Sequence, residues 1–168
     1  MNQKLLTLLE TKIFSEVSYF YGSGEGRIFG AGLLPKDSLS LAYAAGNTLW
    51  ETHDPTAHAE VNVIRMACAD LQTDNLTDYI LLATHEPCPL CLSAAVWAGI
   101  KEIYYLFSYE ETASLFDMQT DLIMSVEVFD RPHCRKQNKL FSMCQLTQPA
   151  EDVNRVKQQY VELFNARL

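Results

Sequence analysis

The chain has few basic residues, few glycines and no long apolar run. Its 168 residues include 13 Lys and Arg against 21 Asp and Glu, which gives a net charge of −8, and only seven glycines. No segment approaches the roughly 18 consecutive apolar residues that a membrane-spanning helix needs. The first 17 residues also lack the basic start and unbroken hydrophobic stretch of a signal peptide. We therefore expect a soluble, cytoplasmic protein with no leader and no membrane partner.

The sequence also lacks an even set of cysteines. A secreted, disulfide-stapled fold usually has four, six or eight of them. This chain has five, and an odd count favours a reducing compartment, which agrees with a cytoplasmic location. The five are Cys68, Cys88, Cys91, Cys134 and Cys144.

The acidic charge is concentrated in one part of the chain. Residues 131–168 carry seven Lys and Arg against three Asp and Glu, so residues 1–130 have a net charge of −12. Such a body repels phosphate backbones, which disfavours a nucleic acid as the partner. The basic surplus at the end of the chain keeps a nucleic-acid contact open as an alternative to an ordinary solvated surface.

Apolar periodicity predicts alternating helices and strands. The strand, helix and strand expected between 79 and 107 indicate a parallel crossover. The whole pattern predicts a protein of the α/β class with a single domain over 1–168. Its expected architecture is a three-layer α/β/α sandwich around a central mixed sheet of about five strands. Residues 110–150 are weakly patterned. The predicted elements are a helix over 1–17, a hairpin of 27–34 and 39–45, a helix after 54–56, a strand at 79–84, a helix from 88 to Gly99, a strand at 102–107 and a helix at 151–166.

Two short motifs carry the residues suited to metal chemistry. They are His58-Ala59-Glu60 and Pro87-Cys88-Pro89-Leu90-Cys91, each at a predicted helix N-terminus. A catalytic zinc takes three nitrogen or sulfur ligands and leaves its fourth position to water, so His58, Cys88 and Cys91 form a complete set. Cys88 and Cys91 are three apart and share one face of their helix. We predict that Glu60 moves protons between the metal-bound water and the substrate.

Other interpretations of these residues stay open at this stage. A Cys-x-x-Cys pair alone also fits a redox site or half of a structural zinc site. Cys134, Cys144 and His133 could form a second metal site. We expect His85 to be a hydrogen-bonded polar residue, Glu86 to bind backbone N–H groups near the ligands, and Cys68, Trp97, Tyr104 and Tyr105 to lie in the core.

The two motifs and their surroundings resemble the cytidine deaminase superfamily in its nucleobase and tRNA deaminase branch. The resemblance is strongest to guanine deaminases, and the clear match covers residues 28–107. The segments that carry it are DPTAHAEVNVIRMACADL (54–71) and THEPCPLCLSAAVWAGIKEIYY (84–105). The resemblance implies one Zn²⁺ per chain, a homodimer and a pocket closed by residues 108–168. It places Asn47 on the base edge, with the backbone N–H of Ala59 on the same ring.

We expect two further substrate contacts: one by aromatic stacking, and one through a carboxylate that the resemblance places after the strand at 102–107. Phe29 is the candidate for stacking on the base. Guanine presents N–H donors, so a guanine site needs a second carboxylate, for which Asp117 is the candidate, with Glu110 and Glu111 as alternatives. The expected function is zinc-dependent hydrolysis of guanine to xanthine and ammonia. The alternatives are a tRNA adenosine deaminase, a deaminase of another heterocycle such as cytosine or a triazine, and a non-catalytic zinc-stabilised scaffold.

Overall fold

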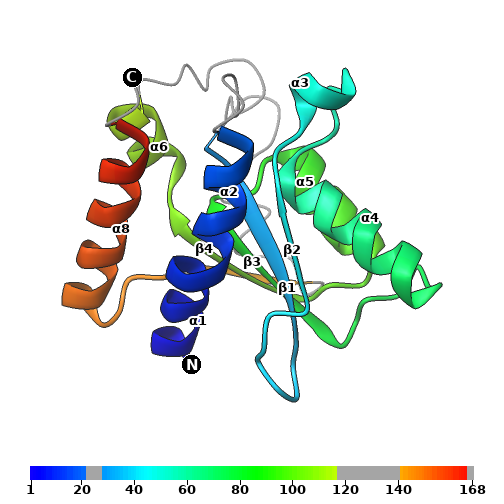
Figure 1. Ribbon diagram of the computed structural model, residues 1–168. Coiled ribbons are helices and arrows are strands. Elements are labelled where there is room, and N and C mark those ends of the chain that lie inside the picture. Colours follow the sequence, from blue (N-terminus) through cyan, green and yellow to red (C-terminus); the bar gives the residue numbers. More distant parts are fainter. Residues whose placement is uncertain (22–27, 117–140, 166–168) are drawn as a thin grey trace.

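The structure is a computed structural model that describes residues 1–21, 28–116 and 141–165 (Figure 1). Helices and strands alternate over most of this length. Their bounds are α1 Asn2–Leu8, the π-helical turn η1 Leu9–Ile13, α2 Phe14–Tyr21, β1 Gly30–Pro35, β2 Tyr43–Gly46, α3 Leu49–Thr52, α4 Ala59–Leu71, β3 Tyr79–His85, α5 Pro89–Trp97, β4 Glu102–Phe107, α6 Tyr109–Phe116, β5 Ser142–Gln145 and α8 Ala150–Asn165.

The five strands form one mixed sheet in the order β2-β1-β3-β4-β5. Strand β1 is antiparallel to both β2 and β3, with Gly30 opposite Gly46, whereas β3, β4 and β5 run parallel. The hairpin and the β3-α5-β4 crossover expected from the sequence are therefore both present. Strand β5 falls in the weakly patterned stretch, because it is a short edge strand whose side chains are only partly buried.

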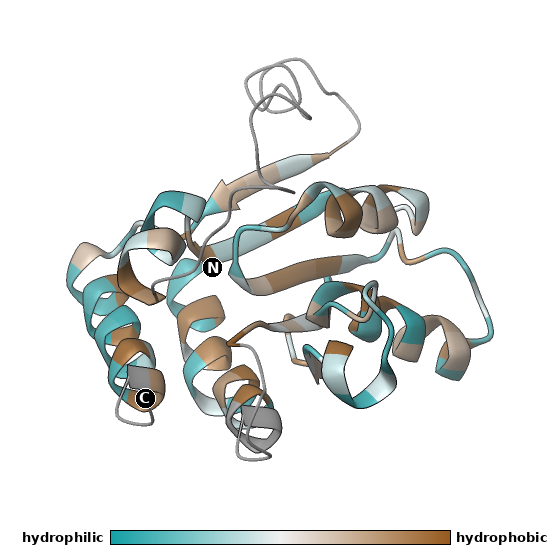
Figure 2. Ribbon diagram, turned by 90° about the horizontal axis from the view of Figure 1, so that it is seen from above, coloured by the Kyte–Doolittle hydropathy of each residue, from teal (hydrophilic) through white to brown (hydrophobic). Residues whose placement is uncertain are grey.

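Helices cover both faces of the sheet, which confirms the three-layer α/β/α arrangement. Along β3, Leu81 packs under α4 and α5, while Ile80 and Leu82 pack under α1, α2 and α8. This alternation follows from the pleat, which points successive side chains to opposite faces. In Figure 2 the apolar strands lie between two groups of helices. Within the described residues, no helix is both long and apolar enough to cross a membrane.

Two glycines on β1 let the N-terminal helices approach the sheet closely. A Cβ at Gly30 would lie 2.2 Å from Cγ2 of Val17, and one at Gly32 would lie 2.4 Å from Cδ1 of Leu41. Neither separation is possible between carbon atoms. Glycine at these positions therefore sets how deeply Val17 and its helix pack on β1.

The end of α5 corrects one prediction and agrees with another. Gly99 follows the helix with φ +78°, the left-handed conformation that glycine adopts at helix ends. Trp97, which we expected in the core, is 89% exposed. The reason is its place on the helix: Cys91, Leu92 and Ala95 face inward, so the last residue of α5 points to the opposite side.

Candidate metal centre and active site

Two helix N-termini meet at the carboxyl end of the parallel strands and carry the predicted ligands. His58 is the N-cap of α4, and Cys88 is the N-cap of α5 with Cys91 in the first turn. Unpaired N–H groups and the positive end of the helix dipole favour negative charge at both positions. The fold therefore places two thiols where their thiolate forms are stabilised.

The three ligand atoms lie at the separations that one tetrahedral ion requires. Nδ1 of His58 is 3.6 Å from Sγ of Cys88 and 3.5 Å from Sγ of Cys91, and the two sulfurs are 3.5 Å apart. Zinc bonds of about 2.0–2.1 Å to nitrogen and 2.3 Å to sulfur give edges of about 3.6 Å and 3.8 Å. Among the described residues, these side chains form the one group of His, Cys, Asp or Glu that could hold a metal ion.

The protonation of the two thiols also suits a metal. The hydrogen bond between the Cys88 and Cys91 sulfurs, and then the one with His58, lowers the pKa of Cys88 to about 4 against the opposing effect of burial. The same hydrogen bond, together with burial and the nearby Glu60, raises the pKa of Cys91. The two buried sulfurs and Glu60 thus oppose a second negative charge at this place, and a divalent ion would supply the compensation that a second thiolate needs.

Glu60 lies beside the three ligand atoms and is almost fully buried. Its side chain is 5% exposed, and its Oε2 accepts a hydrogen bond from the Cys91 thiol at 3.3 Å. Burial, and then the charge of Cys88, raises the pKa of Glu60 to about 7. A carboxyl group that gains and loses a proton near neutral pH is suited to proton transfer.

The residues expected to hold a base lie at the same end of the sheet. Asn47 follows β2 and is 5% exposed, and its backbone N–H donates to the carbonyl of Phe29 at 3.1 Å. Ala59 opens α4, where a backbone N–H has no acceptor within the helix. The ring of Phe29 packs edge-on against His85, with centroids 4.7 Å apart. Phe29 and Asn47 thus lie just before β1 and just after β2, and Ala59 lies next to the ligand His58, while their contact with a substrate stays a prediction.

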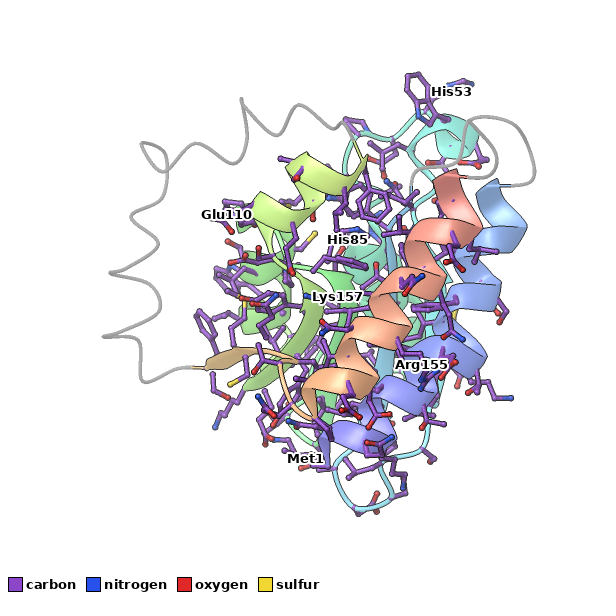
Figure 3. The ribbon with its side chains drawn as sticks, turned by 90° about the vertical axis from the view of Figure 1, so that its left-hand side faces the viewer. Met1, His53, His85, Glu110, Arg155 and Lys157 are labelled. Carbon is purple, nitrogen blue, oxygen red and sulfur yellow. The ribbon has the colours of Figure 1, made fainter. Side chains whose placement is uncertain are left out.

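The second carboxylate of the expected guanine site is not located by the structure. Asp117 lies outside the described residues, as do Cys134 and His133 of the possible second metal site. Of the alternatives on α6, Glu111 accepts hydrogen bonds from Lys157, Gln145 and the backbone of Ser108. This carboxylate therefore binds α6 to β5 and α8. Glu110 is exposed near the outer side of α6 (Figure 3).

Glu86 acts as the sequence suggested, as an acid that holds the ligand loop. Its Oε2 accepts from the backbone N–H of Tyr109 at 3.3 Å, and the Tyr109 hydroxyl donates to the carbonyl of Pro87 at 2.5 Å. These bonds fix the peptide immediately before Cys88 against the start of α6. Residues that hold a ligand loop in this way set the direction of the ligand itself.

His85 corrects the expectation of a fully hydrogen-bonded residue. Its Nδ1 lies 2.8 Å from Oγ1 of Thr84, but its Nε2 is buried without a hydrogen-bond partner. The ring lies between α6 and α8 (Figure 3), surrounded by aromatic rings. Burial lowers the pKa of His85 to about 3. The surrounding rings are Phe29, Phe107, Phe116 and Tyr160.

The neutral His85 should make the fold sensitive to acid. In the unfolded chain a histidine gains its proton near pH 6.5, while the folded chain keeps this ring neutral until about pH 3. Stability is therefore present above pH 6.5 and is lost as the pH falls toward 3, by about 3 kcal/mol at pH 4. Urea unfolding of the metal-free protein at pH 7 and pH 4 should show this loss in wild type and a smaller loss in His85→Leu. Equal losses would show that another group controls acid stability.

Comparison with known proteins identifies the family to which this constellation belongs. The sequence profile described as "Cytidine and deoxycytidylate deaminase zinc-binding region" matches residues 9–107, which include His58, Glu60, Cys88 and Cys91. The chain is a member of this deaminase family. Membership agrees with the metal group found in the structure and with zinc as the ion that it holds.

Relatives with two different substrates match the deaminase region. Guanine deaminase of Bacillus subtilis (strain 168) is 42% identical over 91 residues, which make up 54% of this chain and 57% of that protein. A tRNA-specific adenosine deaminase of Agrobacterium fabrum (strain C58) is 46% identical over 61 residues, which are 36% of this chain and 40% of that protein. The matches thus span about half the length of these curated relatives.

Solved structures give the same two kinds of neighbour. One comes from work on A-to-I editing by tRNA:A34 deaminases at the wobble position of transfer RNA. It superposes with a TM-score of 0.63 at 25% identity and covers 89% of this chain and 99% of its own. The X-ray structure of Bacillus subtilis guanine deaminase gives a TM-score of 0.57 at 27% identity, covering 82% of this chain and 96% of its own. Both confirm the cytidine deaminase-like fold.

Proposed function

We propose that this deaminase-family chain hydrolyses a purine-type nucleobase, with guanine converted to xanthine and ammonia. The observation that supports the proposal is the group of three metal-ligating atoms with the buried carboxyl of Glu60 beside it. The similarity to Bacillus subtilis guanine deaminase, which extends over 91 residues, favours guanine among the possible bases.

The reaction replaces an exocyclic amino group by oxygen. A zinc ion held by His58, Cys88 and Cys91 would lower the pKa of a bound water to about 7. Glu60 takes a proton from the attacking water and gives it to the ring nitrogen beside the reacting carbon. It then gives the second water proton to the departing amino group, which leaves as ammonia while the carbon–oxygen double bond forms. Water supplies every atom that the product gains.

The base is held by groups that surround the same position. The side-chain amide of Asn47 offers both a donor and an acceptor to the base edge, and the N–H of Ala59 offers a donor. Phe29 supplies an aromatic face for the ring. Asp117 remains our candidate for accepting hydrogen bonds from the N–H groups of guanine.

The charges near the site favour a free base over a folded RNA. The short helix α3 and the turn after it, residues 48–54, contain Glu51 and Asp54 but no Lys or Arg. In the described part of the basic C-terminal segment, Arg155 pairs with Glu10 and Lys157 pairs with Glu111. An RNA ligand needs clustered basic side chains that are available to phosphates.

An ammonia-release screen of the zinc-loaded protein tests the proposal. The substrates are guanine, adenine, cytosine, a triazine, their nucleosides and a tRNA anticodon stem-loop. Turnover of guanine above the others supports the proposal. Turnover of adenosine only within the RNA, with tight binding that weakens steeply as salt rises, would establish the tRNA alternative. Ammonia release from none of them would favour the non-catalytic scaffold.

We also propose that the chain works in the cytoplasm as a homodimer that buries the outer face of α5. Leu90, Ala94 and Trp97 form an apolar stripe along this helix, and a tryptophan that is 89% exposed marks an interaction surface. Trp97→Glu should shift the protein from dimer to monomer in sedimentation velocity. The matched change Leu115→Glu, on the exposed side of α6, should leave the dimer intact.

A further inference from the structure

The side chain of Asn62 joins the two loops that flank the proposed pocket. Its Nδ2 donates to the carbonyl of Gly46 at 3.0 Å, to Oγ1 of Thr48 at 2.9 Å and to the carbonyl of Ala57 at 3.1 Å. One amide group therefore shares its two hydrogens among three acceptors from two separate segments. Gly46 and Thr48 lie on either side of Asn47, while Ala57 immediately precedes the metal ligand His58.

These loops have few other contacts that set their distance from one another. One backbone bond joins them, from the N–H of Thr48 to the carbonyl of Ala57 at 3.0 Å. Asn47 itself is tied through its N–H to the carbonyl of Phe29, just before β1, and in the described part of the chain its Oδ1 accepts one long bond, from the N–H of Leu49 at 3.4 Å. The amide of Asn62 is thus the main link between the loop of Asn47 and the start of α4.

Asn62 is placed to act on the loops and not on the reaction. It lies one turn after His58 in α4, and its backbone N–H donates to the His58 carbonyl at 2.8 Å. Glu60 is two residues earlier, about 200° around the helix, and faces the metal group. The side chain of Asn62 therefore points to a different side of α4 from Glu60, and its hydrogen bonds go to the two loops.

We propose that Asn62 is a positioning residue that sets the distance of Asn47 from His58 and Ala59, and so determines how tightly the base is held. This inference rests on the proposed function, because it gives Asn47 and Ala59 the role of base contacts. Small displacements of such groups weaken binding and orientation of the substrate strongly.

The test uses Asn62→Asp, which keeps the shape of the side chain but removes both donors. The carboxylate would face two carbonyl oxygens, so the loops should move apart. With the best substrate of the screen, we expect KM to rise about tenfold while kcat changes less than about threefold. Zinc affinity, measured by competition with a chromogenic chelator, should change less than about threefold, because the ligands themselves are retained. Unchanged KM, or equal loss of zinc and activity, would overturn the proposal.

Arg65→Gln is the matched control. Arg65 lies three residues further along α4 and binds the same loop through Asp54 and Thr56, but it does not reach the segment of Asn47. We expect this variant to keep the wild-type KM. A rise equal to that of Asn62→Asp would mean that general loosening of the loop, and not the link to Asn47, controls binding.

A milder change and a structural measurement keep the two proposals separable. Thr48→Val removes one acceptor of the Asn62 amide and should also raise KM, by a smaller factor than Asn62→Asp does.

If wild type turns over none of the substrates, the proposed function fails, and hydrogen exchange then tests the link between the two loops alone. Asn62→Asp should speed exchange at the amides of Asn47 and Thr48 and leave those of β3 unchanged. Unaltered exchange at these amides would refute the positioning role.

Discussion

Replacing Glu60 by glutamine should lower kcat for base deamination by about 10³- to 10⁴-fold while leaving zinc bound. Glutamine keeps the size of the side chain but cannot accept and return a proton, and positioned acid–base groups supply rate factors of up to about 10⁴. The metal ligands are untouched, because Glu60 contacts only the Cys91 sulfur among them in the hydrogen bonds described above. Steady-state ammonia release and zinc content by atomic absorption on the same preparation measure both effects.

Glu151→Gln provides the control for this experiment. Glu151 is an exposed acid in the first turn of α8, so the same chemical change is made away from the buried site. We expect kcat within about twofold of wild type. If Glu60→Gln retained more than about a tenth of the wild-type kcat, proton transfer would have to be assigned to another group.

Removing the metal should abolish turnover and destabilise the fold together. His58, Cys88 and Cys91 come together only in the folded chain, so an ion that they hold would stabilise the folded state. A ligand present at about 1,000 times its Kd adds about 4 kcal/mol of stability. Dialysis against a chelator should therefore lower both Tm and activity, and one equivalent of Zn²⁺ per chain should restore both. Differential scanning calorimetry and ammonia release follow the two quantities.

Cys88→Ser separates the metal site from the other thiols. This variant should hold far less zinc and resemble the chelated wild type. Cys68→Ser removes a thiol that lies on α4 outside the metal group and should keep full zinc content. Loss of zinc in Cys68→Ser, or retention of it in Cys88→Ser, would require a different ligand set.

The ligand residues could be predicted from sequence because each belongs to a short motif at a helix N-terminus. Cys88 and Cys91 share a helical turn, and His58 is recognised from the His58-Ala59-Glu60 motif and the resemblance to the deaminase superfamily. The layered fold could be predicted because apolar residues repeat every two positions in strands and about every 3.6 positions in helices, which are local patterns. Trp97 was placed wrongly because periodicity locates an apolar helix but does not say which of its residues a neighbour covers.

The features missed by the sequence all depend on contacts between distant segments. Asn62 looks like an ordinary polar helix residue until the loops at Gly46 and Ala57 are placed around it. The lack of a hydrogen-bond partner for Nε2 of His85 results from the packing of α6 and α8 around its ring. Asp117 stays a prediction because it lies outside the described residues.

The two faces of the sheet divide the chain into a chemical side and a supporting side. The metal group and Glu60 belong to α4 and α5, whereas α1, α2 and α8 lie on the opposite face (Figure 1), where Phe14 of α2 packs on Tyr160 of α8. The family profile includes η1 and α2 of the supporting side but ends at residue 107, before α8 begins. The last helix of the supporting side therefore lies outside the region that the family profile describes, while both helices that carry the metal group lie wholly within it.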